Sequence, residues 1–254
     1  MISVEGLSKR FTQRRGKQVE VVAAVSDVHF TAQDARITGL LGPNGAGKTT
    51  SLRIVAGLID ADAGRVHVDG LDIVQSRRQA LGRLGILSDA RGLYPRLSAR
   101  ENILYYARLH GMSDSDANAR IHWLNKVLEM DGLLERRTEG FSQGERMKTA
   151  LARAIVHDPP NIILDEPTNG LDVLSTRRLR AALRRLRDEE GKCIVFSTHI
   201  MQEVERLCDQ VVLVSHGRTV ATGTPAELCA QSGEPDFEEA FVKLAFTSQE
   251  RSAA

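Results

Sequence analysis

A glycine-rich segment near the start of the chain carries the clearest chemical signal. It fits the pattern G-x-x-x-x-G-K-[ST] at every fixed position and runs Gly42-Pro43-Asn44-Gly45-Ala46-Gly47-Lys48-Thr49-Thr50. Glycines let successive backbone N–H groups approach a phosphate chain. Lys48 can supply a positive charge for the β- and γ-phosphates, and Thr49 can offer a hydroxyl to Mg²⁺. An incidental turn is the alternative, but Lys48-Thr49 and the preceding apolar run Ile37 to Leu41 favour a site for ATP and Mg²⁺.

Two adjacent carboxylates follow a second apolar run. The run Asn161 to Leu164 leads directly into Asp165 and Glu166. Side chains of a strand alternate between its faces, so the two acids should point differently. We expect Asp165 to hold Mg²⁺ through water and Glu166 to polarise the attacking water as general base. Acids that merely cap a surface strand are the alternative; the phosphate loop argues against it.

A histidine ends a third apolar run. Ile194 to Ser197 is followed by Thr198-His199. Ligands of parallel sheets bind at the carboxyl ends of the strands. His199 can therefore reach a γ-phosphate if its strand neighbours the strand of Asp165.

Composition limits the class of protein that can position these groups. The chain has 254 residues, of which 42% are apolar and 26% charged, enough for one core or one core with a subdomain. Its 34 basic and 33 acidic side chains give a formal charge of +1, so no nucleic-acid partner is expected. No apolar run reaches the roughly 18 residues of a membrane span, and no secretory signal is visible. Three scattered cysteines indicate reduced thiols in a cytoplasmic protein, with Cys193 buried.

The hydrophobic pattern predicts an α/β fold with added parts. Strands are expected at Ile2 to Leu7 and Val19 to Phe30, and Asp69-Gly70 indicates a hairpin. Alternating strand and helix patterns after His157, including a helix from about Thr176 to Glu190, imply a parallel, doubly wound core. Between Ser98 and His157 the spacing is helical, with Tyr105 expected in the core. The tail is predicted to be a helix that packs on its own domain through Phe237, Phe241 and Leu244.

A further motif brings in a family resemblance. Phe141-Ser142-Gln143-Gly144-Glu145 resembles the signature L-S-G-G-Q of ABC transporter ATPase subunits. The order of phosphate loop, signature, carboxylate strand, Asp172 loop and His199 is also that of the family, so the resemblance covers nearly the whole chain. Gln143 and Glu145 depart from the commonest signature, and this departure bears on affinity for the opposing nucleotide more than on its binding.

The resemblance implies a fold and an assembly. The fold is that of a P-loop NTPase: a doubly wound core with an antiparallel β subdomain over 1–88 and 159–233, an inserted α-helical subdomain over 89–158, and a C-terminal helix and tail over 234–254. It implies a head-to-tail dimer with a second ATPase subunit, expected to be a copy of this chain although a heterodimer stays open. Each ATP would lie between one phosphate loop and the partner's Ser142, Gln143, Gly144 and Glu145. Phe11 would stack on adenine, and Asp172 would link the two sites.

Ser142 also has a purely structural interpretation. Ser142-Gln143-Gly144-Glu145 is a capping box, S-x-x-E, which opens a helix without any ligand. We expect the serine to be a cap in one state and a phosphate donor when the dimer closes.

One position departs from the family in the segment before the signature. The run Leu93-Tyr94-Pro95-Arg96-Leu97-Ser98 to Asn102 matches the family pattern, which places Asp89 where a glutamine is usual. A carboxylate there can still hold Mg²⁺ or water. This variant resembles the sodium-exporting, NatA-type branch of the ABC-2-type exporter ATPases.

The resemblance implies an ATP-hydrolysing subunit on the cytoplasmic face of the cell membrane. It would power export through integral membrane permease subunits, with Na⁺ as a candidate cargo. The alternatives are a non-transport ABC ATPase and a nucleotide-dependent regulatory module. From these 254 residues we expect neither the second cassette of translation-type members nor the coiled coils of repair-type members, and Asp89 is the one hint of a regulatory module.

Overall fold

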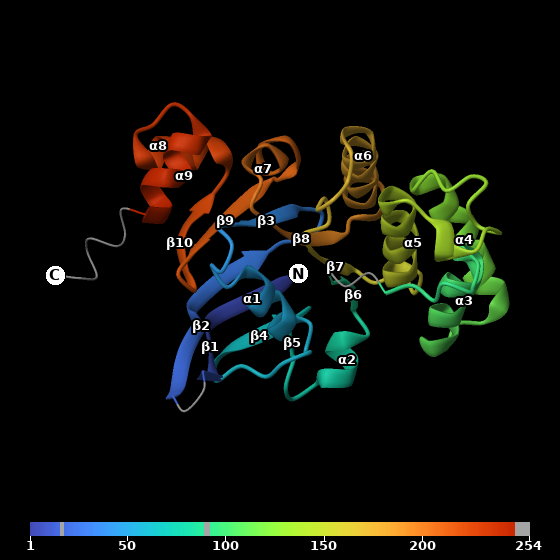
Figure 1. The fold of residues 1–254 in the computed structure, drawn as a ribbon, viewed down its shortest axis with the longest axis horizontal. Coiled ribbons are helices and arrows are strands. Elements are labelled where there is room, and N and C mark those ends of the chain that lie inside the picture. Colours follow the sequence, from blue (N-terminus) through green and yellow to red (C-terminus); the bar gives the residue numbers. More distant parts are fainter. Residues whose placement is uncertain (16–17, 89–91, 247–254) are drawn as a thin grey trace.

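Ten strands form one continuous sheet in the residues that the computed structural model describes, which are 1–15, 18–88 and 92–246 (Figure 1). The order across the sheet is β5-β4-β1-β2-β10-β9-β3-β8-β7-β6. The strands are β1 (Ile2–Arg15), β2 (Gln18–Ala32), β3 (Ile37–Leu41), β4 (Ala63–Val68), β5 (Leu71–Asp72), β6 (Leu84–Leu87), β7 (Asn161–Asp165), β8 (Cys193–Thr198), β9 (Gln210–Ser215) and β10 (Arg218–Gly223).

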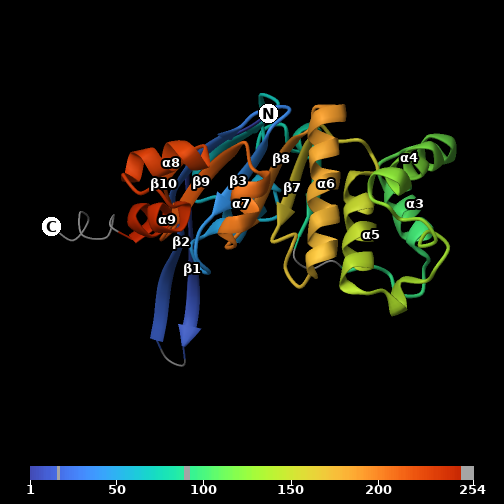
Figure 2. The ribbon, with the colours of Figure 1, turned by 90° about the horizontal axis from the view of Figure 1, so that it is seen from above.

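Helices cover the sheet on both faces and extend it at one end (Figures 1 and 2). None of those in the described residues has both the length and the apolar character that crossing a bilayer demands. The helices are α1 (Lys48–Val55), α2 (Arg77–Leu81), α3 (Ala99–Leu109), α4 (Asp114–Val127), the short 3₁₀ turn η1 (Thr138–Gly140), α5 (Gln143–Ile155), α6 (Val173–Glu190), α7 (Met201–Leu207), α8 (Pro225–Ser232) and α9 (Phe237–Phe246).

The half of the sheet from β9 to β6 is parallel, as the alternating pattern predicts. Strands β3, β7 and β8 are buried at every position. Helix α1 packs on one face through Leu52 and Val55, and α6 packs on the other through Leu183 and Leu186. Two covered faces explain why these strands are apolar runs rather than alternating ones. Cys193 is fully buried, as expected, and burial raises the pKa of its thiol to about 11.

The other half of the sheet is antiparallel and is built mainly from β1, β2 and β4. Strand β1 runs well past its predicted end at Leu7, because it pairs with β2 as far as Arg15 and Gln18, and the two strands project as a hairpin (Figure 2). Strand β2 exceeds its predicted bounds by one residue at its start and two at its end. The predicted turn at Asp69-Gly70 is confirmed. Both residues have positive φ, 49° and 76°, and they connect the antiparallel strands β4 and β5.

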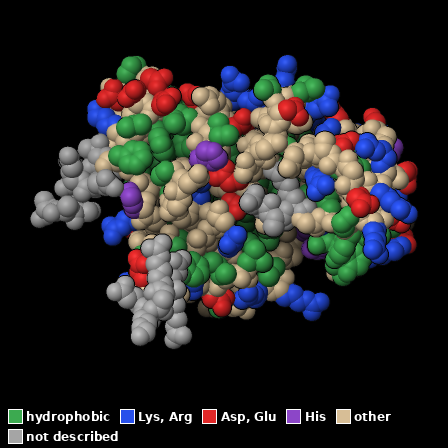
Figure 3. Space-filling model, viewed as in Figure 1, with side chains coloured by type: hydrophobic (Ala, Val, Ile, Leu, Met, Phe, Trp, Pro, Cys, Tyr) green, Lys and Arg blue, Asp and Glu red, His purple; other side chains and the backbone are tan. Residues whose placement is uncertain are grey.

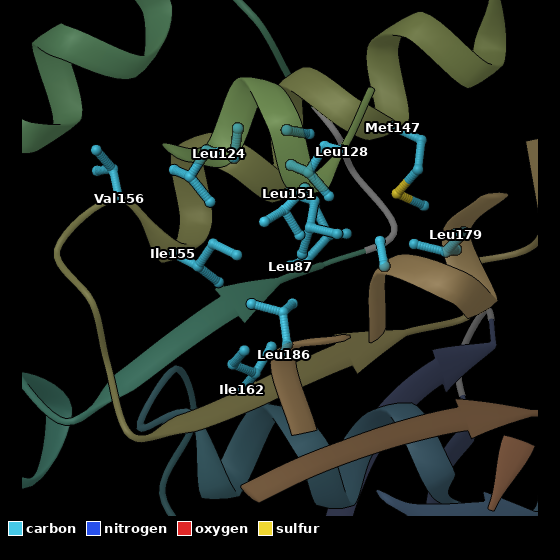
Figure 4. Packing of buried hydrophobic residues seen from close by; sticks show 14 of the residues in the cluster. Leu87, Leu124, Leu128, Met147, Leu151, Ile155, Val156, Ile162, Leu179 and Leu186 are labelled. Carbon is cyan, nitrogen blue, oxygen red and sulfur yellow. The ribbon is translucent and has the colours of Figure 1, made fainter. Parts of the chain in front are cut away.

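Helices α3, α4 and α5 form the helical insertion beyond β6. Figure 4 shows that Leu124 of α4 and Leu151 and Ile155 of α5 pack with Leu87 and Ile162 of the sheet. The insertion therefore shares one continuous apolar core with the parallel strands. Basic and acidic side chains are mixed over its outer surface, in keeping with the formal charge near zero (Figure 3).

The predicted packing of the tail is confirmed. Phe237 and Phe241 of α9 are buried, and they share a small core with Val211 and Leu213 of β9. Leu244 is partly buried against the same cluster.

Two local expectations were wrong. Helix α6 begins at Val173, three residues before the predicted start, because the Asp172 side chain accepts a hydrogen bond from the Ser175 N–H at 2.8 Å and caps the helix there. Tyr105 lies on the outer side of α3 with 43% of its surface exposed, and it meets Tyr94 edge-on with ring centroids 5.5 Å apart.

Replacing Leu151 by alanine tests the shared core. Leu151 is fully buried between the insertion and the sheet, so L151A should lower the free energy of unfolding by about 2–5 kcal/mol, measured by urea titration. Leu58 is 60% exposed, and L58A is the matched control, which should stay within about 0.5 kcal/mol of the parent. Equal losses for the two variants would contradict the assignment of this core.

Candidate nucleotide site

The phosphate loop lies between β3 and α1, and two of its glycines are needed for packing as well as for ligand approach. Gly45 and Gly47 have φ of 81° and 101°, in the left-handed region. A Cβ on Gly42 would lie 2.1 Å from the Val214 carbonyl oxygen, and one on Gly47 would lie 2.5 Å from that of Ala24. The loop therefore lies in close contact with β9 and β2, and Gly42 and Gly47 have no room for a side chain. The sequence motif alone does not reveal this requirement.

Lys48 opens α1 and is almost completely buried, with 5% exposed. Its Nζ donates to the carbonyl oxygens of Gly42 at 2.8 Å and Pro43 at 3.1 Å. It also lies 3.6 Å from Oε1 of Glu166. Burial lowers the pKa of Lys48, and the neighbouring carboxylates of Glu166 and Asp165 oppose that shift.

Thr49, Asp165 and Ser197 form a connected group beside the loop. The Thr49 hydroxyl donates to Asp165 Oδ1 at 3.0 Å, and the Ser197 hydroxyl donates to the same oxygen at 2.6 Å. Ser197 also accepts a hydrogen bond from the Glu166 N–H at 3.0 Å. The sequence argument did not single out Ser197. Its place at the end of the strand before His199 is the signal that could have found it.

Glu166 connects the loop to the histidine. Its backbone has a positive φ of 47°, unusual for a residue with a side chain. Its Oε2 lies 3.0 Å from His199 Nδ1, while Oε1 faces Lys48. His199 was expected to reach the site if its strand neighbours the strand of Asp165. This condition is met, because β7 and β8 are parallel neighbours and Asp165 pairs with Ser197.

These groups border a cavity of about 410 Å³. It is lined by residues 44–50 of the loop, by Glu166, Asn169 and His199, and by Val22 to Ala24 of β2. Phe11 does not line the cavity. It is 38% exposed on β1 directly across from Val22, at the margin of the cavity. Asp89, the remaining proposed metal ligand, lies outside the described residues.

The site can accommodate Mg²⁺ on chemical grounds. The Thr49 hydroxyl and the Asp165 carboxylate lie 3.0 Å apart beside the phosphate loop, and both are oxygen donors of the kind Mg²⁺ prefers. Their arrangement suits an ion that retains waters and binds substrate phosphates.

The signature residues lie away from this cavity and open α5. Ser142 Oγ accepts from the Glu145 N–H at 3.2 Å, and the Glu145 carboxylate accepts from the Ser142 N–H at 2.8 Å, so the predicted capping box is confirmed. Gly144 permits close approach of α6, since a Cβ there would lie 2.6 Å from Ser175 Oγ. Gln143 lines a second cavity of about 640 Å³. The fold thus brings Lys48 and the carboxylates together but not the signature of the same chain.

Comparison with known proteins gives a consistent picture. The family described as ABC transporter matches residues 25–169. The ABC transporter ATP-binding protein NatA of Bacillus subtilis is 40% identical over 243 residues, which cover 95% of this chain and 97% of NatA. The linearmycin resistance ATP-binding protein LnrL of Bacillus subtilis is 33% identical, covering 92% of this chain and 72% of LnrL. The Nod factor export ATP-binding protein I of Burkholderia lata is 39% identical, covering 80% of this chain and 67% of that protein.

Solved structures agree with the fold. An ATP-binding subunit of an ABC transporter superimposes with a TM-score of 0.82 at 27% identity, covering 96% of this chain and 98% of that one. The dimeric cassette MJ0796 superimposes with a TM-score of 0.77 at 24% identity, covering 88% of this chain and 98% of that one, and supports the fold alone. The fold class expected from the sequence is confirmed.

Replacing Lys48 by alanine tests the phosphate loop. K48A removes the one ammonium group held beside the loop carbonyls in the described residues, so nucleotide affinity should fall by roughly 100-fold or more, measured by titration with a fluorescent ATP analogue. Lys126 is exposed on α4, and K126A is the matched control. Unchanged affinity of K48A would contradict the role assigned to this lysine.

Proposed function

Because this chain belongs to the family of ABC transporter ATP-binding proteins, we propose that it hydrolyses ATP to drive export through separate membrane subunits. One observation carries the catalytic part of the proposal. Glu166 sits between Lys48 and His199 at the mouth of the phosphate loop, with its carboxylate 3.0 Å from the imidazole and 3.6 Å from the ammonium group. A carboxylate in that place can act on water next to a γ-phosphate.

The residues divide the chemistry among them. Glu166 takes up the proton of the attacking water as general base. His199 orients the Glu166 carboxylate through the contact at Oε2. It lines the same cavity as the phosphate loop, so we assign it to contact the γ-phosphate. Lys48 exchanges its loop carbonyl acceptors for phosphate oxygens, because a charged oxygen is the stronger acceptor.

Thr49 and Asp165 are the residues that would hold Mg²⁺. When bound, the ion neutralises charge on the β- and γ-phosphates. Ser197 keeps the Asp165 carboxylate turned toward Thr49 through its 2.6 Å hydrogen bond. This support fixes the carboxylate before substrate arrives.

A second subunit completes the site in this proposal. Ser142 stands exposed at the start of α5 and does not line the cavity of its own chain. In a head-to-tail pair, Ser142 and Gly144 of each copy contact the γ-phosphate bound by the other. ATP then bridges the two copies, and its hydrolysis separates them again. This cycle of closing and opening is the mechanical output.

The transport part of the proposal rests on the relatives. Nod factor export and linearmycin resistance appear in the names of two relatives, and the NatA protein matches over nearly its full length. We assign this chain to the cytoplasmic face of the membrane, bound to integral permease subunits, with outward transport and Na⁺ as the first cargo to test.

Replacing Glu166 by glutamine separates binding from hydrolysis. E166Q keeps the shape and the phosphate loop but removes the base, so it should bind ATP, accumulate as a dimer and hydrolyse at least roughly 100-fold more slowly. Phosphate release and light scattering measure the two effects. Glu205 is exposed on α7, and E205Q is the matched control. Turnover of E166Q at the wild-type rate would show that the base has been misassigned.

Co-purification tests the membrane part. A polytopic membrane protein encoded beside this chain should co-purify with it, because the proposal assigns the transport path to such a subunit. Vesicles that contain both chains should move Na⁺ only with ATP, and not when the ATPase carries K48A. Transport of another solute under the same conditions would reassign the cargo, while absence of a membrane partner would contradict the transporter assignment.

A further inference from the structure

The acid in the signature creates an electrostatic conflict. Glu145 occupies the position where the family signature commonly has glutamine, in the first turn of α5. In the proposed function this helix end must approach the γ-phosphate of a second copy. A carboxylate repels that phosphate, and the repulsion grows as the closing interface excludes water.

The structure shows how the carboxylate is held. Its Oε2 accepts from the Ser142 N–H at 2.8 Å, and its Oε1 accepts from Nη1 of Arg136 at 2.7 Å. The pKa of Glu145 is lowered chiefly by the Ser142 N–H bond, with a further contribution from Arg136, while partial burial opposes the shift. Glu145 is therefore charged at neutral pH, and Arg136 is its counter-ion.

Contacts with Phe141, Leu133 and Ala99 also hold Arg136 in place. Its guanidinium lies over the ring of Phe141, 5.2 Å from the centroid. Its backbone N–H donates to the Leu133 carbonyl at 3.0 Å, and its own carbonyl accepts from the Ala99 N–H at 3.1 Å. The residue is anchored by the start of α3 and directs its charge toward the start of α5.

Neighbouring cations donate their hydrogen bonds elsewhere, although Lys148 lies near enough to Glu145 for the two charges to interact. Arg146 donates to the backbone carbonyls of Phe141 and Glu139, at 3.0 and 3.3 Å. Lys148 donates to the carbonyl of Glu129 at 2.7 Å. Among the described residues, Arg136 is the basic side chain that forms an ion pair with Glu145. Since 51% of its side chain is exposed, the pair contributes little to folding, and fold stability does not account for it.

We propose that Arg136 is a positioning residue of the dimeric nucleotide site. It holds the Glu145 carboxylate on the Ser142 cap and neutralises its charge, so that the start of α5 can receive the γ-phosphate bound by a second copy of this chain. The inference rests on the proposed function, because the phosphate comes from the partner copy. It assigns to Arg136 and Glu145 together the electrostatic role that a neutral glutamine has alone.

The test is a double-mutant cycle in the full chain carrying E166Q, with ATP-dependent dimerisation measured by light scattering. R136Q should raise the ATP concentration for half-maximal dimerisation by roughly tenfold, because it exposes the Glu145 charge to phosphate. In a chain that also carries E145Q, adding R136Q should change that concentration by less than about twofold. R136K keeps the charge but loses the planar guanidinium that stacks on Phe141, so it should raise that concentration less than R136Q does. Thermal unfolding of each variant checks the fold.

The outcomes separate this inference from the proposed function. A parent that dimerises with ATP but is indifferent to R136Q would overturn the inference alone. Equal losses from R136Q with and without E145Q would also overturn it, since Arg136 would then act on the phosphate or on the fold directly. A parent that does not dimerise with ATP would overturn the proposed function, and the inference with it.

Discussion

Three neighbouring parallel strands end at the same level of the sheet, and the rest of the site depends on this constraint. Strand β8 lies between β3 and β7, and its register pairs Thr198 with Leu41 on one side and Ser197 with Asp165 on the other. The phosphate loop, the carboxylates and His199 therefore leave the sheet within one residue of each other. A one-residue slip of β7 would turn Asp165 to the opposite face and remove it from Thr49. Burial of all three strands on both faces fixes that register.

The same constraint makes it possible to bury a lysine. A charged ammonium group with 5% exposure is costly unless it is paired. Lys48 has loop carbonyls at 2.8 and 3.1 Å and a carboxylate at 3.6 Å, and these partners lie directly after β3 and β7. The carboxylate is in turn aligned by the histidine directly after β8. The end of each strand positions one group of this network, so the catalytic groups and the packing of the sheet cannot be separated.

The sequence could predict those parts of the site that depend on local spacing. The phosphate loop, the acid pair at a strand end and the capping box at Ser142 are each contained in a few consecutive residues. Contacts between distant segments were not predictable. The close approach of Gly42 to the Val214 carbonyl and the role of Ser197 depend on which strands become neighbours. A single sequence does not specify which strands these are. Tyr105 was wrongly placed in the core, because a helical pattern alone does not reveal which face of α3 is covered.

The signature serine illustrates how one residue can satisfy the fold and the proposed chemistry together. Aspartate would cap α5 as well as serine does, since both can accept the Glu145 N–H. A hydroxyl, however, has one hydrogen to donate besides its two acceptor lone pairs, and an ionised aspartate has none. Ser142 can accept the cap bond at 3.2 Å and still turn its hydrogen toward a phosphate oxygen. Closure of the dimer then does not require the helix to lose its cap, so the free energy of ATP binding is available for joining the two copies.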